Sequence, residues 1–393
     1  MFCRRMPNLK KCAPITKRGN LLFLLVGLVF LNFLVSEIIM IISKGTIVRD
    51  KRSQLITNIS RSPSDVEMAP DPYTRLSQVS GVRAIKAFYS RVWKTKTTKY
   101  SANFILDGHQ ICSNSTFPYL LILIPSIIEN VDIRNSIRRT WGSVCANSTK
   151  MQSTFMNVSK LVFIVGNKPV SDELNHVFRE EHAVHGDIVQ ADFNDTFYNL
   201  TRKMLIAFNW VNKFCRNVQY ILKADEDAFV HIPRLLMFLK SQKHDTNGVM
   251  YGYKYGSSRV SRFGKYKVSK DEFPRQYFPP YLSGTSYVIS SDIILQLVTL
   301  AEYTPYCPIE DAFITGILAT IAGVSVQHSR RFTHLLEKIV PCEFVQSKIA
   351  VTGVNIQCRY FLWKLIMRMS EENICRQISH SDISTTCPIF MHE

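Results

Sequence analysis

Residues 220–230 read YILKADEDAFV, an apolar run followed at once by acids. A short apolar run bounded by polar residues is typical of a buried strand, here at 218–222. Asp225 and Asp227 are two residues apart, so on extended backbone their carboxylates point the same way and can share Mg²⁺ or Mn²⁺. The alternative is a solvated acidic loop that begins a helix, where acids interact favourably with the helix dipole.

Apolar runs and helical patterns alternate around this segment. Strands are predicted at 120–124, 161–165, 187–190 and 218–222. Helical periodicity lies between or after them, at 133–141, at 196–214 and from Pro233 onward. This alternation predicts an α/β fold with a mostly parallel central sheet and helices on its faces. Ligands of such sheets bind beyond the carboxyl ends of the strands, which is where the acids after Leu222 lie.

A second acidic pair, Glu310-Asp311, follows Pro305 and Pro308 and therefore begins a predicted helix. An acid at that position commonly caps the helix N-terminus. The functional alternative is a carboxylate that accepts the proton of an attacking hydroxyl group. The pair alone leaves both interpretations open.

Two more segments have both a structural and a functional interpretation. Residues 134–142, RNSIRRTWG, form either an amphipathic helix with Trp141 in the core or a set of arginines that contact a diphosphate. Residues 278–287, FPPYLSGTSY, place two prolines before Ser-Gly. Such a rigid turn either lines a pocket or ends a loop.

The N-terminal sequence predicts a membrane anchor. Residues 1–20 carry Lys and Arg but no acid, and residues 21–42 are almost wholly apolar. A hydrocarbon core about 30 Å thick needs roughly 20 such residues. With the basic flank in the cytoplasm, we expect a single-pass type II protein with a cytoplasmic tail at 1–20, a transmembrane signal anchor at 21–42, a stem at 43–112 and a lumenal domain at 113–393. The alternatives are a cleaved signal peptide and a buried core helix.

Charge and cysteine content agree with a lumenal protein. Lys and Arg number 48 against 31 Asp and Glu, a formal charge of +17. The excess indicates an anionic partner, but a lumenal location argues against nucleic acid. Cysteines after the predicted anchor are Cys112, Cys145, Cys215, Cys307, Cys342, Cys358, Cys375 and Cys387, whose disulfide pairing stays open. Glycan acceptor motifs occur at Asn58, Asn114, Asn147, Asn157, Asn194 and Asn199.

Taken in order, these segments resemble the beta-1,3-glycosyltransferases of glycosyltransferase family 31. The similar blocks are RNSIRRTWG at 134–142, LVFIVG at 161–166, EEHAVHGDIVQADFNDTFYNLTRK at 180–203, YILKADEDAFV at 220–230, YKVSKDEFPRQYFPPYLSGTSYVIS at 266–290 and EDAFITG at 310–316. Their order and spacing over 118–365 make the resemblance specific, although each block alone is weak. It implies a GT-A-like nucleotide-sugar-binding fold behind an N-terminal transmembrane helix.

The resemblance also implies an activity. It is the inverting transfer of a hexose, galactose first, from a UDP-sugar to the 3-hydroxyl of an acceptor sugar on a glycoprotein or glycolipid, with Mn²⁺, at the Golgi membrane. A beta-1,3-N-acetylglucosaminyltransferase is the nearest alternative. A catalytically weak lectin-like relative and a surface adhesion protein also stay open.

Matching residue by residue assigns roles. Asp311 corresponds to the general base, Asp227 to the principal metal ligand and Asp225 to its support. The remaining binding residues implied by the resemblance are Arg134, Arg138, Trp141, Asp192 and Lys203 for the donor, and Tyr281, Gly284 and Glu310 for the sugar or acceptor pocket.

Two positions depart from the family pattern. Glu226 stands where the family usually has Asp. Thr352 aligns with a His that commonly precedes a late Trp, here Trp363. We expect His328, His334 or water to complete the metal shell in its place.

Overall fold

The computed structural model describes residues 100–112, 118–145, 158–242, 247–334 and 347–368. The predicted tail, the predicted anchor and most of the predicted stem lie outside these ranges. Within them, no helix combines the length and apolar character that crossing a membrane requires. The predicted anchor at 21–42 therefore stays a prediction.

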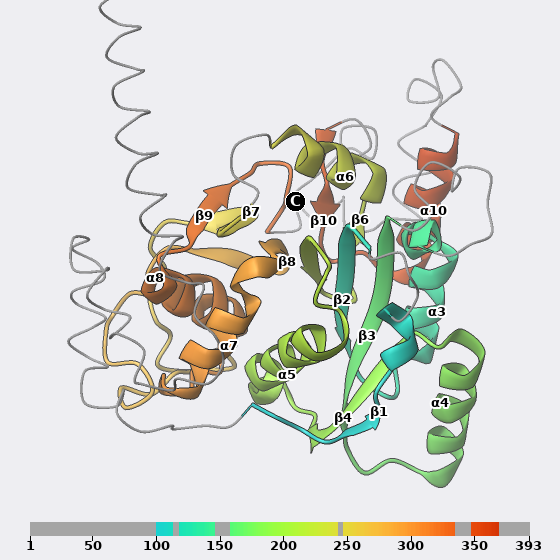
Figure 1. Ribbon diagram of the computed structural model, residues 1–393, viewed down its shortest axis with the longest axis horizontal. Coiled ribbons are helices and arrows are strands. Elements are labelled where there is room, and N and C mark those ends of the chain that lie inside the picture. The colour runs from blue at the N-terminus through green and yellow to red at the C-terminus, as the bar shows by residue number, and fades with distance from the viewer. Residues whose placement is uncertain (1–99, 113–117, 146–157, 243–246, 335–346, 369–393) are drawn as a thin grey trace, which may run out of the picture. The chain divides into compact units, whose positions relative to one another are not determined.

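An eight-stranded sheet organises the described residues, in the order β1-β4-β3-β2-β5-β8-β7-β9 (Figure 1). Its strands are β1 (Phe104–Leu106), β2 (Leu120–Ser126), β3 (Ser159–Asn167), β4 (Ile188–Asn194), β5 (Tyr220–Ala224), β7 (Val249–Tyr255), β8 (Tyr281–Ser290) and β9 (Ser325–His328). A separate two-stranded sheet pairs β6 (Phe229–Val230) with β10 (Ala350–Val351).

The sheet has a parallel half and a mixed half. Strands β4, β3, β2 and β5 run parallel, as the alternating pattern predicts. Beyond β5, strand β8 is antiparallel to both of its neighbours, β5 and β7, while β7 and β9 are parallel to each other and run in the direction of β5. The predicted α/β class with a mostly parallel sheet is confirmed, while the antiparallel pairs were not predicted.

Helices cover both faces of this sheet (Figure 1). They are α3 (Val131–Arg139), α4 (Asp172–His185), α5 (Leu200–Phe214), α6 (Ile232–Ser241), α7 (Ile294–Glu302), α8 (Ala319–Ala322) and α10 (Ile356–Met367). The predicted helix at 196–214 is observed as a short 3₁₀ turn followed by α5. Pro233 lies in the first turn of α6, where its missing N–H costs nothing.

The core consists of two layers because alternate side chains of a strand face opposite ways. In β2, Leu121 and Leu123 pack with α5 and α7. Leu120 and Ile122 belong to the other layer, which includes residues of α3, α6 and α10. A strand buried on both faces reads as a continuous apolar run, which is why β2 was predictable.

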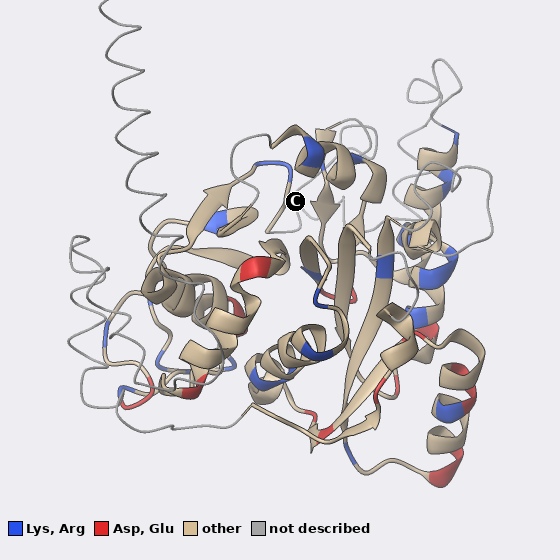
Figure 2. Cartoon of the chain, in the orientation of Figure 1, with Lys and Arg blue, Asp and Glu red and all other residues tan. Residues whose placement is uncertain are grey.

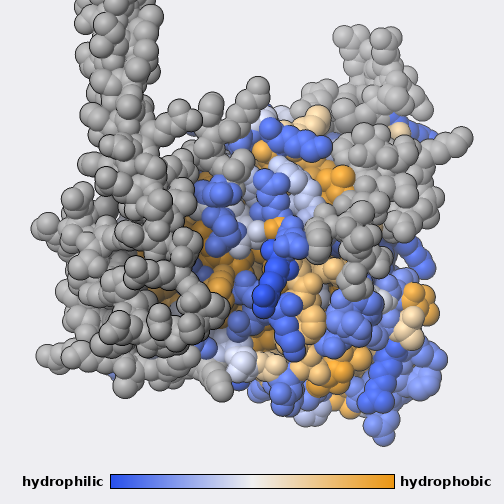
Figure 3. Space-filling model, in the orientation of Figure 1, coloured by the Kyte–Doolittle hydropathy of each residue, from blue (hydrophilic) through white to orange (hydrophobic). Residues whose placement is uncertain are grey.

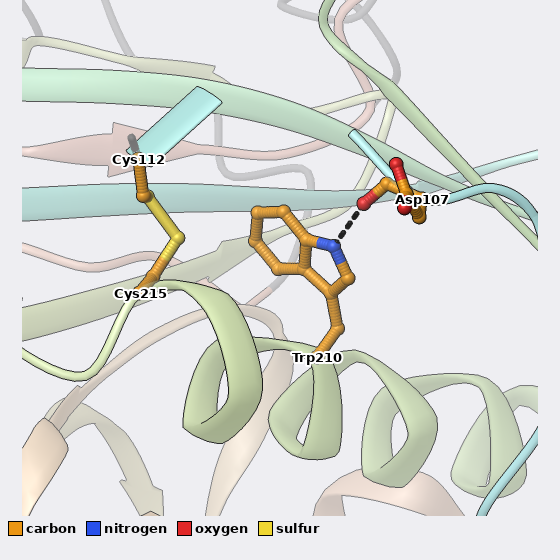
Figure 4. Close-up of a disulfide and its surroundings, with 4 residues drawn as sticks. All are labelled: Asp107, Cys112, Trp210 and Cys215. Atoms are coloured by element: carbon orange, nitrogen blue, oxygen red, sulfur yellow. Dashed lines mark hydrogen bonds between the residues drawn. A yellow bond between two sulfur atoms is a disulfide. The ribbon is translucent and has the colours of Figure 1, made fainter. Parts of the chain in front are cut away.

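The folded body begins earlier than the predicted boundary at residue 113. Strand β1 pairs with β4 at the sheet edge, and a disulfide joins Cys112 to Cys215 after α5 (Figure 4). The indole N–H of Trp210 donates to the carbonyl of Asp107 beside it (Figure 4). Residues 100–112, assigned from sequence to the stem, are thus part of the packed domain. The strand is only three residues long, too short to leave a periodic pattern.

Charged residues are dispersed over the described part of the domain. Lys and Arg lie on α3, α5, α6 and α10 rather than on one helix (Figure 2). Hydrophilic and hydrophobic residues are interspersed over the described portion of the face in Figure 3.

Candidate active site

A wide cleft in the described residues opens at the carboxyl ends of the parallel strands. It encloses about 1140 Å³. Ser126, the last residue of β2, lies on its wall together with the acidic triplet that follows β5. Residues 353–357 and Arg359 line the same cleft. Its position is the one that open α/β sheets use for ligands.

The three acids have different surroundings. Asp227 is exposed, and the hydroxyl of Thr352 lies 3.4 Å from its Oδ1. Asp225 keeps 36% of its side chain exposed, while its Oδ1 pairs with Lys223. Glu226 accepts hydrogen bonds from Ser126 and from Asn130, the latter at 2.6 Å. Both carboxylate oxygens of Glu226 are therefore used in hydrogen bonds to other side chains, whereas Asp225 and Asp227 present carboxylates to the cleft.

These two carboxylates fit a hard divalent cation as a partial ligand set. Within the described ranges, no group of three or more His, Cys, Asp or Glu is arranged to hold a metal ion. Cations such as Mg²⁺ are often held by one or two carboxylates while substrate phosphates and water supply the remaining oxygens. Asp225 and Asp227 would hold an ion of that kind.

Lys203 lies in the cleft wall as an almost completely buried ammonium group. Its Nζ is 2.7 Å from Asp195 Oδ1 and donates to the carbonyl of Ser126 at 2.6 Å. Burial lowers the pKa of Lys203, and the opposing charge of Asp195 raises it in part. This ammonium group fixes the end of β2 against the turn that precedes α5.

Asp195 rather than the predicted Asp192 belongs to this cleft. Asp195 lines the cleft and accepts the amide N–H of Gly166 at 2.8 Å. Asp192 is exposed on β4 and accepts a bond from Asn167 Nδ2 at 3.1 Å. It is not among the described residues that line this cleft or the neighbouring one. Asp192 and Asp195 are three residues apart, and nothing in the sequence indicates which of them lines the cleft.

A second cavity of about 410 Å³ adjoins the cleft and shares Asp225 with it. Tyr281, Gly284, Glu310 and Asp311 all line it, so the structure brings these four predicted residues together. Tyr281 and Gly284 lie on β8, and Asp311 directly precedes the π-helix Ala312–Leu318. Single π-turns of this sort are frequent at functional sites.

Two backbone donors orient the Asp311 carboxylate. The N–H of Gly284 donates to Oδ2 and the N–H of Ala312 donates to Oδ1, each at 2.8 Å. A Cβ at position 284 would lie 3.0 Å from Oδ2, so a side chain there would crowd the Asp311 carboxylate. Burial raises the pKa of Asp311, against the lowering by the Ala312 N–H and by Lys223. The residue is thus a helix cap whose carboxylate is held in one orientation.

Glu310 and Lys223 form a buried pair next to Asp311. Lys223 Nζ pairs with Asp225, donates to the carbonyl of Gly284 and lies 3.6 Å from Glu310 Oε2. The hydroxyl of Tyr287 donates to Glu310. Burial raises the pKa of Glu310 to about 7, although Lys223 opposes the rise. Lys223, hidden inside the apolar run 220–224, was missed from sequence.

Arg134, Arg138 and Trp141 require a correction. None of the three is among the described residues lining the cleft or the second cavity. Arg134 is buried and pairs with Glu181 at 2.7 Å, and Trp141 is fully buried in the core. Arg138 pairs with Glu181 at 2.6 Å and with an Asp187 oxygen at 2.7 Å. The arginines therefore pair with Glu181 and Asp187 instead of lining the cleft.

Arg134 still acts on the cleft indirectly. Its guanidinium donates to Ser126 Oγ at 2.8 Å, and that hydroxyl donates to Glu226. From the other side, buried Arg359 of α10 donates to the carbonyl of Glu226 and to Ser136. Both arginines thus hold the acidic loop from behind. No local pattern in α10 distinguishes Arg359 from a surface arginine, so it was missed.

Thr352 and the two histidines proposed to replace the family's histidine lie in different places. Thr352, which stands at the position of the family's histidine, lies beside the predicted metal ligand Asp227. His334 lines the second cavity and stacks on Tyr253 with ring centroids 3.7 Å apart. His328 accepts the Lys254 N–H at 3.1 Å and contacts the Tyr253 ring edge. The structure therefore puts a hydroxyl, not an imidazole, next to Asp227.

Comparison with known proteins shows which family this chain belongs to. The galactosyltransferase family profile matches residues 132–330. Beta-1,3-galactosyltransferase 5 of Gorilla gorilla gorilla is 33% identical over 262 residues, which cover 64% of this chain and 85% of the relative. Lactosylceramide 1,3-N-acetyl-beta-D-glucosaminyltransferase A of Xenopus laevis is 34% identical over 271 residues, 67% of this chain and 70% of the relative.

Among solved structures, galactosyltransferase LgtC in complex with donor and acceptor sugar analogs aligns with 54% of this chain and 74% of its own length. The TM-score is 0.29 and the identity 11%, too little to support any argument. The family profile and the sequence relatives show a glycosyltransferase, and the structure gives it an α/β fold. The chain belongs to the galactosyltransferase family.

Proposed function

We propose that this protein transfers a hexose from a UDP-sugar to the 3-hydroxyl of an acceptor sugar, forming a beta-1,3 linkage with inversion. The observation that carries the proposal is the adjacency of two cavities. One contains the carboxylates of Asp225 and Asp227, the other contains the oriented carboxylate of Asp311, and Asp225 lines both. The larger cleft suits the nucleotide-sugar and the smaller one the acceptor.

The acid–base step follows from the geometry around Asp311. The acceptor O–H gives its proton to an Asp311 oxygen while the hydroxyl oxygen forms a bond to the anomeric carbon. The bond from that carbon to the UDP oxygen breaks, and UDP departs with the bonding electrons. Attack opposite the leaving group inverts the anomeric centre. The N–H groups of Gly284 and Ala312 hold the base in place before the reaction, which avoids reorganisation during it.

A divalent ion such as Mn²⁺, held by Asp225 and Asp227, would supply positive charge for the departing diphosphate. The chain's own contribution is to hold those carboxylates. Lys223 fixes Asp225, and Arg359 fixes the loop through the Glu226 carbonyl. The Lys203–Asp195 pair anchors the cleft wall. These contacts preorganise the donor site on rigid elements.

Galactose is the first donor to test, and N-acetylglucosamine is the second. The two sequence relatives described above carry names of both activities. One extra substituent in a pocket changes selectivity by only about 1–3 kcal/mol. The test is a panel of UDP-sugars and acceptor glycosides with linkage analysis of the product. A beta-1,3 product from one of them supports the proposal. UDP binding without any transfer would instead support a catalytically weak relative.

The wider setting is also proposed. A GT-A-type arrangement is consistent with the parallel strands that end at the acidic loop. A Golgi location with residues 43–393 in the lumen rests on the basic and apolar pattern of residues 1–42. The disulfide between Cys112 and Cys215 suits an oxidising compartment. Immunofluorescence with a tag at each end, before and after permeabilisation, tests the location and the orientation.

A further inference from the structure

The mouth of the smaller cavity carries exposed aromatic rings that the reaction itself does not require. Tyr266, in the segment between β7 and β8, lines this cavity and is 57% exposed. Phe197, in the turn before α5, lines both cavities and is 38% exposed. Their ring centroids are 5.7 Å apart with an interplanar angle of 67°. Two segments distant in sequence thus meet edge to face at the cavity mouth.

A cation accompanies the two rings. Lys265 Nζ lies 4.7 Å from the Phe197 centroid and 5.6 Å from the Tyr266 centroid. We name Phe197, Lys265 and Tyr266 the aromatic rim. Exposed aromatic groups at a cavity mouth leave apolar surface in water, which usually marks a binding surface. The rim combines apolar ring faces with the Lys265 ammonium and the Tyr266 hydroxyl, as expected of a surface for a polar ligand that has apolar faces.

The rim's position identifies what it would bind. The accepting hydroxyl must reach Asp311 inside the smaller cavity, so the sugar that carries it occupies that cavity. The walls there are already aromatic, since Tyr255, Phe278 and Tyr281 line it. The next sugar of the acceptor must leave through the mouth, where Tyr266 is both a lining residue and largely exposed. A pyranose ring has C–H faces that suit an aromatic ring and hydroxyls that suit an ammonium group.

We propose that the aromatic rim is a subsite for the second sugar of the acceptor, so that the enzyme selects chains of at least two sugars over a single sugar. This inference rests on the proposed function. It assigns to Tyr266 a role in acceptor length selection, separate from the base and from the donor carboxylates.

The test compares paired acceptors on the full-length protein. Each pair ends in the same accepting sugar. Methyl β-galactoside is compared with methyl β-lactoside, and methyl β-N-acetylglucosaminide with a β-1,4-linked disaccharide whose terminal sugar is also N-acetylglucosamine. Tyr266→Ala should raise the KM for the disaccharide about 5- to 30-fold. This factor lies within the loss of affinity that follows when a nucleobase loses an aromatic stacking partner in nucleic-acid-binding proteins. The KM for the UDP-sugar and kcat/KM for the monosaccharide should not change. An unchanged ratio of disaccharide to monosaccharide kcat/KM in Tyr266→Ala overturns the inference.

Two variants provide controls. Tyr266→Phe keeps the ring and should keep the preference for the disaccharide. Phe263 is 85% exposed in the same segment but is not among the described residues that line either cavity. Phe263→Ala should therefore leave both acceptors unaffected. An equal loss of selectivity in Phe263→Ala and Tyr266→Ala would show that the segment as a whole is responsible, and it would also overturn the subsite.

Failure of the proposed function is distinguishable from failure of the rim. If the unaltered protein transfers no sugar to any acceptor, the proposed function fails. The rim is then judged by saturation-transfer NMR on methyl β-lactoside. A signal from the second sugar that disappears in Tyr266→Ala but persists in Tyr266→Phe supports the subsite. An absent signal, or one that is equal in both variants, overturns it.

Discussion

Replacing Lys203 by Met would remove one member of an almost fully buried ion pair in the donor cleft. The side chains of Lys203 and Asp195 are each 4% exposed, and their charged atoms are 2.7 Å apart. The methionine keeps most of the apolar stem but leaves the Asp195 carboxylate without its cation. One oxygen of Asp195 retains the N–H of Gly166. The carbonyl of Ser126 also loses its donor.

The expected cost follows from that burial. Breaking a buried pair by removing one partner typically costs about 3–5 kcal/mol, because an uncompensated charge stays out of water. That is a large part of the total stability of about 5–15 kcal/mol that native proteins have. We therefore expect Lys203→Met to lower the free energy of unfolding by about 3–5 kcal/mol. Weakened UDP binding should accompany the loss, since both residues line the cleft.

Chemical denaturation of the purified full-length protein, followed by tryptophan fluorescence, measures this cost. Asp195→Asn supplies the reciprocal single variant, and Lys203→Met with Asp195→Asn completes a double-mutant cycle. Because the double variant buries no lone charge, it should recover about 2–3 kcal/mol relative to the sum of the two single losses. Single losses below about 1 kcal/mol that simply add would refute the account of this pair.

Three further predictions concern other parts of the fold and site. Replacing Cys112 and Cys215 by Ala should cost about 4.7 kcal/mol, the chain-entropy value for a loop of about 100 residues, measured by the same denaturation; a loss below about 1 kcal/mol would contradict it. Gly284→Ala should lower kcat more than it changes the donor KM, because a methyl group would displace the Asp311 carboxylate; unchanged steady-state rates would exclude that crowding. Burial raises the pKa of Glu310 in the folded protein to about 7, above its ordinary value of 4.5. Its contribution to the free energy of unfolding is therefore present below about pH 4.5 and is lost as the pH rises to about 7. Glu310→Gln should remove that part of the pH dependence of the melting temperature, and a pH profile identical to that of the unaltered protein would reject this role of Glu310.

The parallel half of the fold was predictable because its strands are buried on both faces. Strands such as β2 and β5 read as continuous apolar runs, and the helices between them keep a 3.6-residue period. The antiparallel half was not predicted. Strand β8 contains Ser283, Gly284 and Thr285, which give no apolar run, and its pairing with β5 is set by contacts distant in sequence.

The site was predictable where chemistry and chain position coincide. Asp225 and Asp227 follow a strand end, and Asp311 begins a helix, so each stands where local geometry exposes a carboxylate. Arg134 and Arg138 show the limit of that reasoning. Their type suits a diphosphate, but the sequence cannot reveal that Glu181 and Asp187 would lie close enough to neutralise them.

Two charged residues near the acidic loop were missed because their positions in the sequence give no sign of a functional role. Lys223 lies inside a buried strand, and Arg359 lies within a C-terminal helix that showed no motif. Arg359 and Thr352 contact the acidic loop from positions far along the chain. Lys223 is only two residues from Asp225, but its other partners, Gly284 and Glu310, lie on distant elements. Only the folded chain shows these partners, because each depends on packing between separate elements.

The most direct test of the central claim is the transfer rate of Asp311→Asn. The asparagine keeps an oxygen that can accept the Gly284 N–H but cannot take a proton from the acceptor. We expect kcat to fall by roughly 10²- to 10⁴-fold, the usual contribution of a general base. The melting temperature and the affinity for UDP should stay near those of the unaltered protein. Transfer at an undiminished rate in a folded Asp311→Asn protein would contradict the assignment of the base.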